Sequence, residues 1–322
     1  MEFVGDGIYF GLDETTYHAT PYLGSSNMKE LYASPSDYWW DSHMNPMREI
    51  KTSSPAQAYG RALHHRILYG EQAFIKDYVK VEGELGDSVS AEGLKTWIKE
   101  QGGNPHKLKA DNEAMVASEY KVNLLSETTH NAISIASQMI LKNPNLTQAF
   151  VGGWPEVSVF WHQDGVPCKA RFDYLKRRVI VDLKSFRGKD RIKTLDQTVL
   201  QDLFAYRYDI QTAHYLNGHE AAAELVAAGK IFADTLRPDD AWLKAAFAEK
   251  AQWVFCFFKA DGMPVAKSYQ ISNGSPAHES GRVACKIALA NYSDCMAKFG
   301  TDAWVNLDEP FVIAEEDMPK WL

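Results

Sequence analysis

Two aspartates and a lysine that lie close together in the chain have the clearest potential for chemistry: Asp173, Asp182 and Lys184. Because residues two apart on a strand share a face, Asp182 and Lys184 are predicted to point to the same side. If Lys176-Arg177 forms a tight turn, Asp173 lies opposite Ile180 and diagonal to Asp182, on that same face. A loop longer by one residue would send Asp173 to the other face and separate the carboxylates.

Such a set suits the hydrolysis of a phosphodiester bond. A hard cation such as Mg²⁺ prefers oxygen ligands, polarises a phosphoryl oxygen and lowers the pKa of an attacking water. Lys184 would orient that water or stabilise the developing negative charge. The competing interpretation is a structural Asp–Lys pair on an amphipathic strand. However, residues 179–181 (Val-Ile-Val) are apolar on both faces, and ionised groups on a buried strand need a partner or a metal, so a functional role is favoured.

The elements around these residues predict an α/β fold. Three β-rich segments, at 156–161, 169–175 and 179–185, are expected to form an antiparallel meander. Further elements are expected in this order: a helix at 206–216, strands at 252–258 and 265–271, and a closing helix at 276–299. The first of these two strands is almost wholly apolar, so we expect it to be central. The order predicts a central mixed sheet flanked by helices.

The N-terminal part is predicted to be mainly helical. Asn27 and Glu30 have the spacing of a capping box, and Ser34-Pro35 is expected to end that helix. A second helix is expected at 57–69, and apolar residues at helical spacing predict one long helix over 109–142.

Composition is that of a soluble, cytoplasmic protein. Of the 322 residues, 45% are hydrophobic and 24% charged, and the N-terminus lacks the pattern of a secretory signal. Four scattered cysteines without a CxxC pair predict neither a disulfide framework nor a zinc or iron–sulfur site. Because no repeat or linker is evident, residues 1–322 are predicted to be one domain. Its helical part spans 1–150, and 151–322 contain the core sheet.

The net charge of −8 argues at first against a nucleic acid ligand. Yet residues 169–193 contain ten Lys or Arg against three Asp, a local net charge of +7. Such a segment matches the electrostatic footprint of a polyanion site, although a solvated charged hairpin is the more common explanation.

These motifs also resemble a known superfamily. The D…DLK hairpin resembles the signature of the PD-(D/E)XK nucleases, with Asp182 and Lys184 in the (D/E)XK element and Asp173 as the preceding acid. Gly60-Arg-Ala-Leu-His64 resembles the GxxxH helix of the RecB-like branch, and Gln211-Thr-Ala-His-Tyr215 its QxxxY helix. Residues 22–31, followed by Ser34-Pro35, resemble the N-terminal pattern of the RecE-like exonucleases (exodeoxyribonuclease VIII and phage relatives).

The resemblance implies a restriction-endonuclease-like core with an N-terminal helical elaboration, and a metal site. His64, Asp173 and Asp182 would bind Mg²⁺, with Mn²⁺ as a substitute, and the carbonyl of Leu183 would add a ligand. Lys184 would position the water. His65 would face elsewhere, although its position next to His64 leaves the choice between the two open.

Other residues have a supporting role by resemblance or by position. Gln211 and Tyr215, one helical turn apart, would hydrogen-bond a phosphate or Lys184. Glu156 would reach the metal, or equally would serve as a surface or capping residue. Four basic residues after the active strand are candidates for backbone phosphate contacts, with a mobile basic loop as the alternative: Arg187, Lys189, Arg191 and Lys193. The aromatic cluster Tyr38-Trp39-Trp40 is expected to pack in the core rather than stack bases.

The implied activity is an exodeoxyribonuclease that degrades linear duplex DNA from 5′ to 3′ in phage-type recombination. The resemblance also implies a bacterial host cell, a single-strand annealing protein as partner and a ring-like homo-oligomer. The alternatives are an endonuclease of the same superfamily, an inactive DNA-binding or assembly protein on a nuclease fold, and an unrelated metal-binding protein. A Cas4-like enzyme is disfavoured, because those enzymes hold an iron–sulfur cluster on cysteines that this chain lacks.

Overall fold

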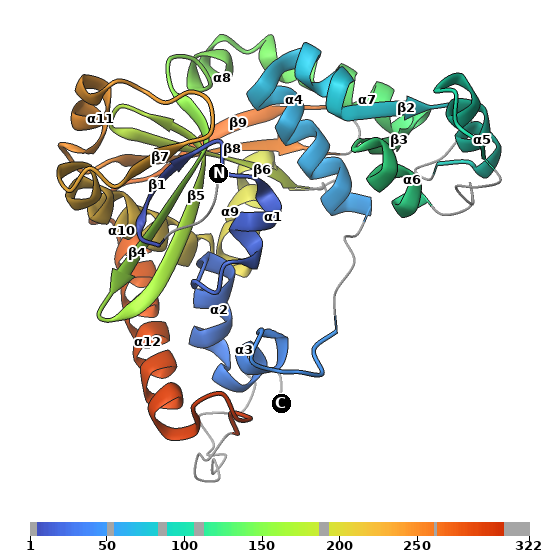
Figure 1. Ribbon diagram of the computed structural model, residues 1–322. Helices are drawn as coiled ribbons and strands as arrows, with labels where there is room; N and C mark the ends of the chain where they lie inside the picture. Colours follow the sequence, from blue (N-terminus) through green and yellow to red (C-terminus); the bar gives the residue numbers. More distant parts are fainter. Residues whose placement is uncertain are drawn as a thin grey trace, which may run out of the picture.

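The computed structural model describes residues 5–49, 55–82, 89–105, 113–186, 193–260 and 263–305. Within these ranges, seven strands form one mixed sheet in the order β7-β1-β4-β5-β6-β8-β9 (Figure 1). The strands are β1 (Gly7–Phe10), β4 (Trp154–Gln163), β5 (Val166–Lys176), β6 (Val179–Phe186), β7 (Ile231–Ala233), β8 (Gln252–Lys259) and β9 (Ala266–Ile271). Neighbours are antiparallel except β1–β7 and β6–β8, which are parallel. The predicted meander and the mixed sheet are confirmed.

Helices α2 (Ser25–Ala33), α10 (Tyr208–Ala227) and α12 (Pro276–Phe299) share one hydrophobic core with the sheet. From α10, Ile210 and Ala213 are fully buried in this core. The long closing helix was predicted correctly. By contrast, α10 extends well beyond the expected 206–216, and α9 (Leu195–Ala205) was not predicted.

Helices α4 (Pro55–Asp77) and α7 (Glu127–Leu141) form a second core with the sheet, apart from the one that holds α10. Leu63 of α4 packs in this core with Val181 of β6, whereas Ile180 of β6 belongs to the core that holds α10. Strand β6 is therefore buried on both faces, as its continuous apolar run predicted. The helices on the two faces of the sheet can be followed in Figure 1.

The β5–β6 hairpin has a different register from the predicted one. The observed pairs are Tyr174–Val181, Leu175–Ile180 and Lys176–Val179. The turn is therefore at Arg177-Arg178, where Arg178 has a φ of 66°. The predicted pairing of Asp173 with Ile180 was wrong by two residues. Because side chains alternate with a period of two, this shift leaves Asp173 on the predicted face, directly opposite Asp182 in the continued register.

The N-terminal half contains more β structure than predicted. β1 lies inside the main sheet, between β7 and β4. β2 (Tyr78–Val81) and β3 (Asn123–Ser126) form a separate parallel pair. The single helix predicted over 109–142 is wrong, because α6 (Glu113–Tyr120), β3 and α7 divide the described part of this segment. Ser126 ends β3 and caps α7 by accepting a hydrogen bond from the Thr129 N–H.

Two predicted helix boundaries need correction. In α2 the cap is Gly24, whose N–H donates to Asn27 Oδ1, so Asn27 is the third helical residue and not the cap. Ser34 ends α2 as expected and also caps α3 (Pro35–Asp41). The helix predicted at 57–69 is the longer α4, which continues past a kink at Gly70, where φ is 84°. The remaining helices are α1 (Glu14–Ala19), α5 (Ala91–Glu100), α8 (Pro144–Ala149) and α11 (Asp240–Phe247).

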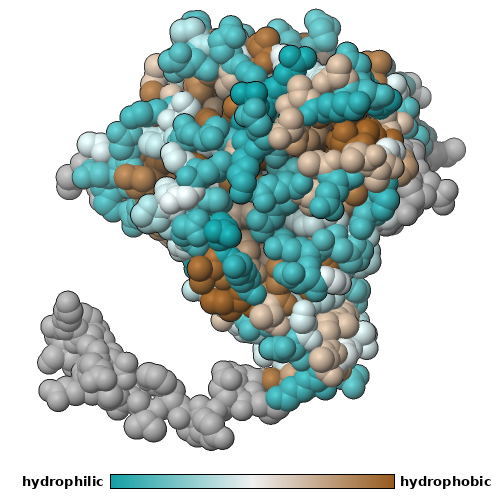
Figure 2. Space-filling view, turned by 90° about the vertical axis from the view of Figure 1, so that its left-hand side faces the viewer, coloured by the Kyte–Doolittle hydropathy of each residue, from teal (hydrophilic) through white to brown (hydrophobic). Residues whose placement is uncertain are grey.

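The surface is mainly hydrophilic on the side shown in Figure 2, with hydrophobic patches among the polar atoms. No helix in the described ranges has both the length and the apolar character needed to cross a membrane.

Candidate active site

Four ionisable side chains from α4, β5 and β6 meet where β5 and β6 stop pairing. His64 Nε2 lies 2.9 Å from Asp173 Oδ2. Lys184 Nζ lies 2.6 Å from Asp182 Oδ2. The predicted convergence of Asp173, Asp182 and Lys184 is what the structure shows, and His64 is the histidine that faces them. Its neighbour His65 points away and contacts Asp77 at 3.1 Å.

The Asp173 carboxylate also completes the backbone hydrogen bonding of the hairpin. The ladder of β5 and β6 ends at Tyr174–Val181. Beyond it, the Leu183 N–H donates to Asp173 Oδ2 at 2.7 Å. A side-chain oxygen thus replaces the main-chain acceptor of a continued ladder. This contact fixes Asp173 against the strand that carries Asp182 and Lys184.

Gln211 of α10 contacts the Asp182 oxygen that Lys184 does not contact. Its Nε2 donates to Asp182 Oδ1 at 2.8 Å, in a contact that is shielded from solvent. The sequence predicted that Gln211 would hydrogen-bond a phosphate or Lys184, whereas its hydrogen-bond partner in the structure is Asp182. Tyr215, one turn later, contacts Ser25 of α2 and the Arg171 backbone. The expected contact of Tyr215 with Lys184 is not among its interactions in the described residues.

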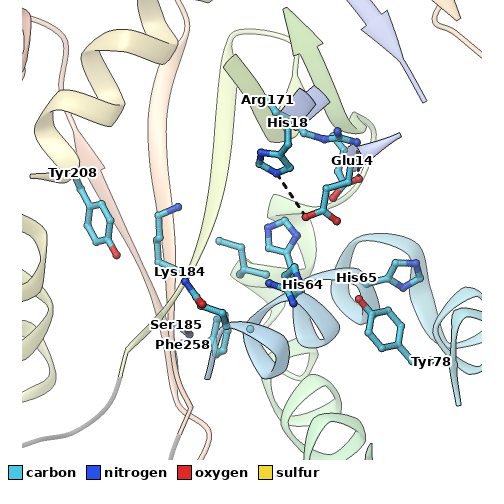
Figure 3. A pocket seen from close by; sticks show the side chains of 15 residues that line it. Glu14, His18, His64, His65, Tyr78, Arg171, Lys184, Ser185, Tyr208 and Phe258 are labelled. Carbon is cyan, nitrogen blue, oxygen red and sulfur yellow. Dashed lines mark hydrogen bonds and ion pairs between the residues drawn. The ribbon is translucent and has the colours of Figure 1, made fainter. Parts of the chain in front are cut away.

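Lys184 and His64 line a cavity of about 540 Å³, together with Leu183 and Tyr208. Figure 3 shows Lys184 and Tyr208 on one side of this cavity and Glu14, His18 and Arg171 on the other, with His64 between them. Asp182, which pairs with the cavity residue Lys184, is only 1% exposed. The cavity is large enough to admit part of a polymeric substrate to the Asp–Lys pair.

Residues 25–233 match a protein family described as a PDDEXK-like domain of unknown function (DUF3799). The chain belongs to this PDDEXK-like family. The matched range includes His64, Asp173, Asp182 and Lys184 as well as Gln211.

The fold of this PDDEXK-like chain is similar to a solved structure from Eubacterium rectale, described as a "putative exonuclease". The two share 14% sequence identity with a TM-score of 0.50, over 94% of this chain and 97% of the other. A second structure, SSO0001, aligns with a TM-score of 0.23 and 9% identity over 81% of this chain and 85% of its own, and is too dissimilar to carry an argument. A comparison with curated proteins gave no match.

In this PDDEXK-like site the pKa values of the two aspartates are shifted in opposite directions. Burial raises the pKa of Asp182 to about 6, with repulsion from Asp173 in the same direction and Lys184 in opposition. Burial acts to raise the pKa of Asp173, but the charge and hydrogen bond of His64, the charge of Lys184 and the Leu183 N–H together outweigh it, and the net shift is downward. For Lys184, burial is outweighed by both carboxylates, which raise its pKa to about 12. The site therefore has one carboxylate stabilised by an imidazole and one in a costly environment.

The donor chemistry fits a hard divalent cation. Asp182 Oδ2 is buried, and its partner is the Lys184 ammonium group at 2.6 Å. Two carboxylates and a backbone carbonyl are the oxygen ligands that Mg²⁺ prefers. Among the described residues, no group of three or more His, Cys, Asp and Glu side chains is arranged to hold a metal ion. A cation at these oxygens would compete with the two ion pairs, which now satisfy the carboxylates.

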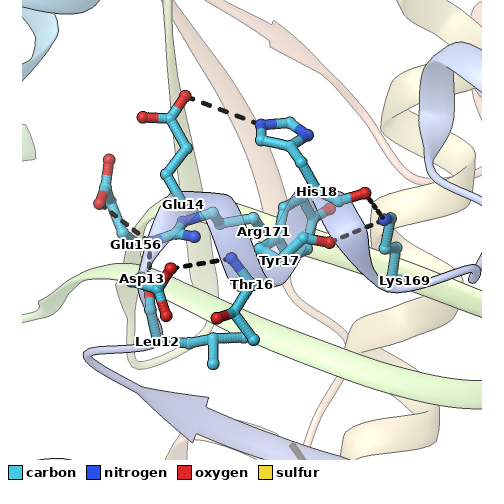
Figure 4. Close-up of polar contacts among 9 residues, drawn as sticks. All are labelled: Leu12, Asp13, Glu14, Thr16, Tyr17, His18, Glu156, Lys169 and Arg171. Atoms are coloured by element: carbon cyan, nitrogen blue, oxygen red, sulfur yellow. Dashed lines mark hydrogen bonds and ion pairs between the residues drawn. The ribbon is translucent and has the colours of Figure 1, made fainter. Parts of the chain in front are cut away.

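Glu156, which was predicted either to reach the metal or to serve as a surface or capping residue, lies in the wall of the same cavity. Its Oε2 accepts hydrogen bonds from the Tyr69 hydroxyl at 2.8 Å and from Arg171 Nη2 at 3.2 Å. Arg171 Nη2 also donates to the Leu12 carbonyl at 2.6 Å, and Figure 4 shows the two contacts of Arg171 beside the Glu14–His18 pair. Glu156 is thus an acceptor for two neighbours in the wall. Its predicted metal contact stays a prediction.

The basic residues of segment 169–193 do not all serve the same role. Lys169 is buried and donates to the Tyr17 carbonyl at 2.8 Å (Figure 4) and to the Thr20 carbonyl at 2.7 Å, so it has a structural role. Lys193 donates to Gln201. The other three candidates for phosphate contacts, Arg187, Lys189 and Arg191, lie outside the described residues.

Two residues close to the site were not predicted: Lys29 of α2 and Tyr208 of α10. Lys29 Nζ lies 4.8 Å from the centre of the Tyr208 ring, and Lys184 Nζ lies 5.5 Å from the same centre. Burial, with the neighbouring Lys184, lowers the pKa of Lys29 to about 8. The helix that resembles the RecE-like N-terminal pattern therefore brings a second ammonium group to the site.

Proposed function

We propose that this protein is a metal-dependent nuclease that hydrolyses phosphodiester bonds of DNA. The observation that carries the proposal is that Asp173 and Asp182 are paired with His64 and Lys184, two residues that line one cavity. Membership of the PDDEXK-like family supports it. Buried ionised groups reduce stability unless they are paired or bind a cation, and a cluster of them beside a cavity is typical of a functional site, which favours a functional role over a structural one.

Each residue has a distinct role in this proposal. Asp173, Asp182, His64 and the Leu183 carbonyl would hold Mg²⁺ or Mn²⁺, which supplies polarisation of the phosphoryl oxygen and a more acidic attacking water. Lys184, at the cavity wall, is placed to orient that water and to stabilise the negative charge that develops on the phosphate.

The supporting residues act through these groups. Gln211 fixes the orientation of the Asp182 carboxylate through its hydrogen bond to Oδ1. The Leu183 N–H does the same for Asp173. Such contacts pre-organise the acids before substrate arrives, and Tyr215 ties the helix that carries Gln211 to α2.

The finer part of the proposal is exonuclease action on linear duplex DNA, from 5′ to 3′, in phage-type recombination within a bacterial cytoplasm. It rests on the resemblance of the hairpin, the GxxxH and QxxxY helices and the N-terminal pattern to RecE-like enzymes. The similar fold described as an exonuclease is consistent with it. A single-strand annealing protein as partner and a homo-oligomer belong to the same proposal.

The decisive experiment is Mg²⁺-dependent digestion of linear and covalently closed circular duplex DNA by the wild type, Asp182→Ala and Lys184→Ala. As a matched control, Asp196→Ala and Lys267→Ala remove an exposed Asp–Lys pair whose atoms lie 2.8 Å apart. We expect degradation of linear DNA alone, inhibited by EDTA, abolished in both active-site variants and retained in both controls. DNA labelled at either the 5′ or the 3′ end then gives the direction of cutting.

Each other outcome changes the proposal in a defined way. Cutting of the closed circle would identify an endonuclease. Binding without cleavage would favour a DNA-binding or assembly protein. Cleavage that survives both active-site substitutions would refute the assignment of these residues.

A further inference from the structure

Tyr208 and Tyr206 lead from the cavity to the surface, and Phe204 lies two residues before Tyr206 in the chain; these three side chains are called the strip below. Its inner end is Tyr208, which lines the cavity and packs on Phe255 and Phe257 of β8 with ring centres 5.7 and 6.0 Å apart. Tyr206 comes next, its ring centre 5.9 Å from that of Tyr208. Tyr206 is 50% exposed, and Phe204, near the end of α9, is 55% exposed.

The inner end of the strip is also positively charged. Lys29 and Lys184 both place their ammonium groups within 6 Å of the Tyr208 ring centre. Next to Tyr208, Arg207 has a left-handed φ of 50°, its guanidinium is paired with Asp209, and it lies over the Tyr32 ring. Two ammonium groups therefore lie at the point where the strip meets the cavity.

Exposed aromatic rings beside half-buried cations match the needs of an unpaired nucleic acid strand. Every base presents a flat π face, so stacking on aromatic side chains tolerates any sequence, while cations contact the phosphates. A paired duplex would offer its bases only at its end. The strip is therefore better suited to single-stranded nucleotides than to the body of a duplex.

We propose that Tyr206 and Phe204 stack unpaired bases of a DNA strand whose backbone passes Lys29 and Tyr208 on its way to Lys184. The occupant of the strip is thus a single-stranded end of the substrate. This inference rests on the proposed nuclease function, and it specifies which form of DNA reaches the cavity.

The test is the binding of a fluorescently labelled oligothymidylate to the full chain, followed by anisotropy in EDTA so that no cleavage occurs. Phe204→Ala and Tyr206→Ala should each raise the Kd about fivefold or more, since one stacked base contributes on the order of 1 kcal/mol or more. Tyr206→Phe keeps the ring and should bind like the wild type. Phe204→Leu keeps an apolar side chain without the ring and should bind weakly.

Two further variants separate the kinds of contact. Trp40→Ala removes another exposed aromatic, on α3 and 62% exposed, and should leave the Kd unchanged. Lys29→Gln should weaken binding and reduce the salt dependence of log Kd by about one phosphate contact. Because Phe204 and Tyr206 are exposed, their variants should unfold at the wild-type temperature, and a matching Tm verifies that they fold.

Several results would overturn the inference. The inference is wrong if the wild-type protein fails to bind the oligonucleotide. It is also wrong if the alanine variants bind it as tightly as the wild type does, because the strip would then not bind single-stranded DNA. If linear DNA is still cut in that case, the nuclease function stands alone. Alanine variants that lose only self-association, measured by sedimentation, would make the strip an interface between copies. If binding depends on the strip but the protein never cleaves DNA, the single-strand binding site is supported and the proposed nuclease function is refuted.

Discussion

The hydrogen bond between Gln211 and Asp182 provides a strong test of the site, and Gln211→Leu removes it with little change in size. Gln211 is 6% exposed and Asp182 1%, so water cannot easily replace the lost donor. A buried hydrogen bond to a charged group contributes about 1.5–3 kcal/mol. Because Lys184 already pairs with Asp182 Oδ2, Gln211→Leu would leave the buried Oδ1 without its donor. We therefore expect a loss of about 2–3 kcal/mol in the free energy of unfolding.

Urea unfolding at neutral pH without added metal measures this loss. The matched control is Gln270→Leu, which removes a side-chain hydrogen bond of similar length, 2.7 Å to Gln252, at an exposed position. It should change the free energy of unfolding by less than about 0.5 kcal/mol. Under the proposed function, Gln211→Leu should also lower the cleavage rate or metal affinity about 10- to 100-fold, since groups that orient a ligand have effects of that size.

The two measurements separate the possible errors. A stability loss no larger than that of Gln270→Leu would contradict the buried, charge-assisted hydrogen bond. A full stability loss with unchanged cleavage would show that Gln211 only supports the fold and that Asp182 needs no orientation for activity.

Three more predictions follow from single contacts. Gly60→Ala should raise the free energy of unfolding by about 0.5–1 kcal/mol, because its added carbon lies 3.7 Å from Ser185 Oγ without a clash and alanine favours a helix; the same methyl enters the cavity wall and should reduce cleavage. His214, whose buried Nε2 lies 2.9 Å from the Lys169 carbonyl, has a pKa lowered by burial to about 4, so its contribution to stability is full above pH 6.5 and is lost as the pH falls toward 4; His214→Gln should reduce the loss between pH 7.5 and pH 5 by about 2 kcal/mol in urea titrations. Tyr215→Phe removes a hydroxyl that lies near Ser25 and the Arg171 backbone, keeps the ring that packs on Phe172 and Trp253, and should lower the free energy of unfolding by no more than about 1 kcal/mol in the same measurement.

The active-site hairpin was predictable because its information is local. Alternating side chains and a short turn determine that Asp182 and Lys184 share a face, and Asp173 joins them for any register of the correct parity. The turn is at Arg177-Arg178 and not at Lys176-Arg177. Because the pairing is shifted by two residues, Asp173 still lies on the predicted face of the sheet.

Elements that depend on distant partners were missed. β1 is a four-residue strand whose pairing partners, β4 and β7, lie far along the chain. β3 was included in a predicted helix because its apolar residues continue a helical spacing, and only its parallel pairing with β2 makes it a strand. In both cases tertiary contacts determined the conformation, and no local pattern distinguishes them.

The partner of Gln211 could not be predicted for a similar reason, since it depends on how closely two helices approach. Gly281 of α12 packs against α10 so tightly that a Cβ atom there would lie 2.1 Å from the Asp209 carbonyl oxygen. Asp209 is two residues before Gln211, and its carboxylate also accepts a hydrogen bond from Ser280. The helix that presents Gln211 to Asp182 is therefore positioned by a close contact with a glycine distant in sequence. A QxxxY pattern identifies the residue, but the Asp182 contact exists because α12 allows α10 to lie at that depth.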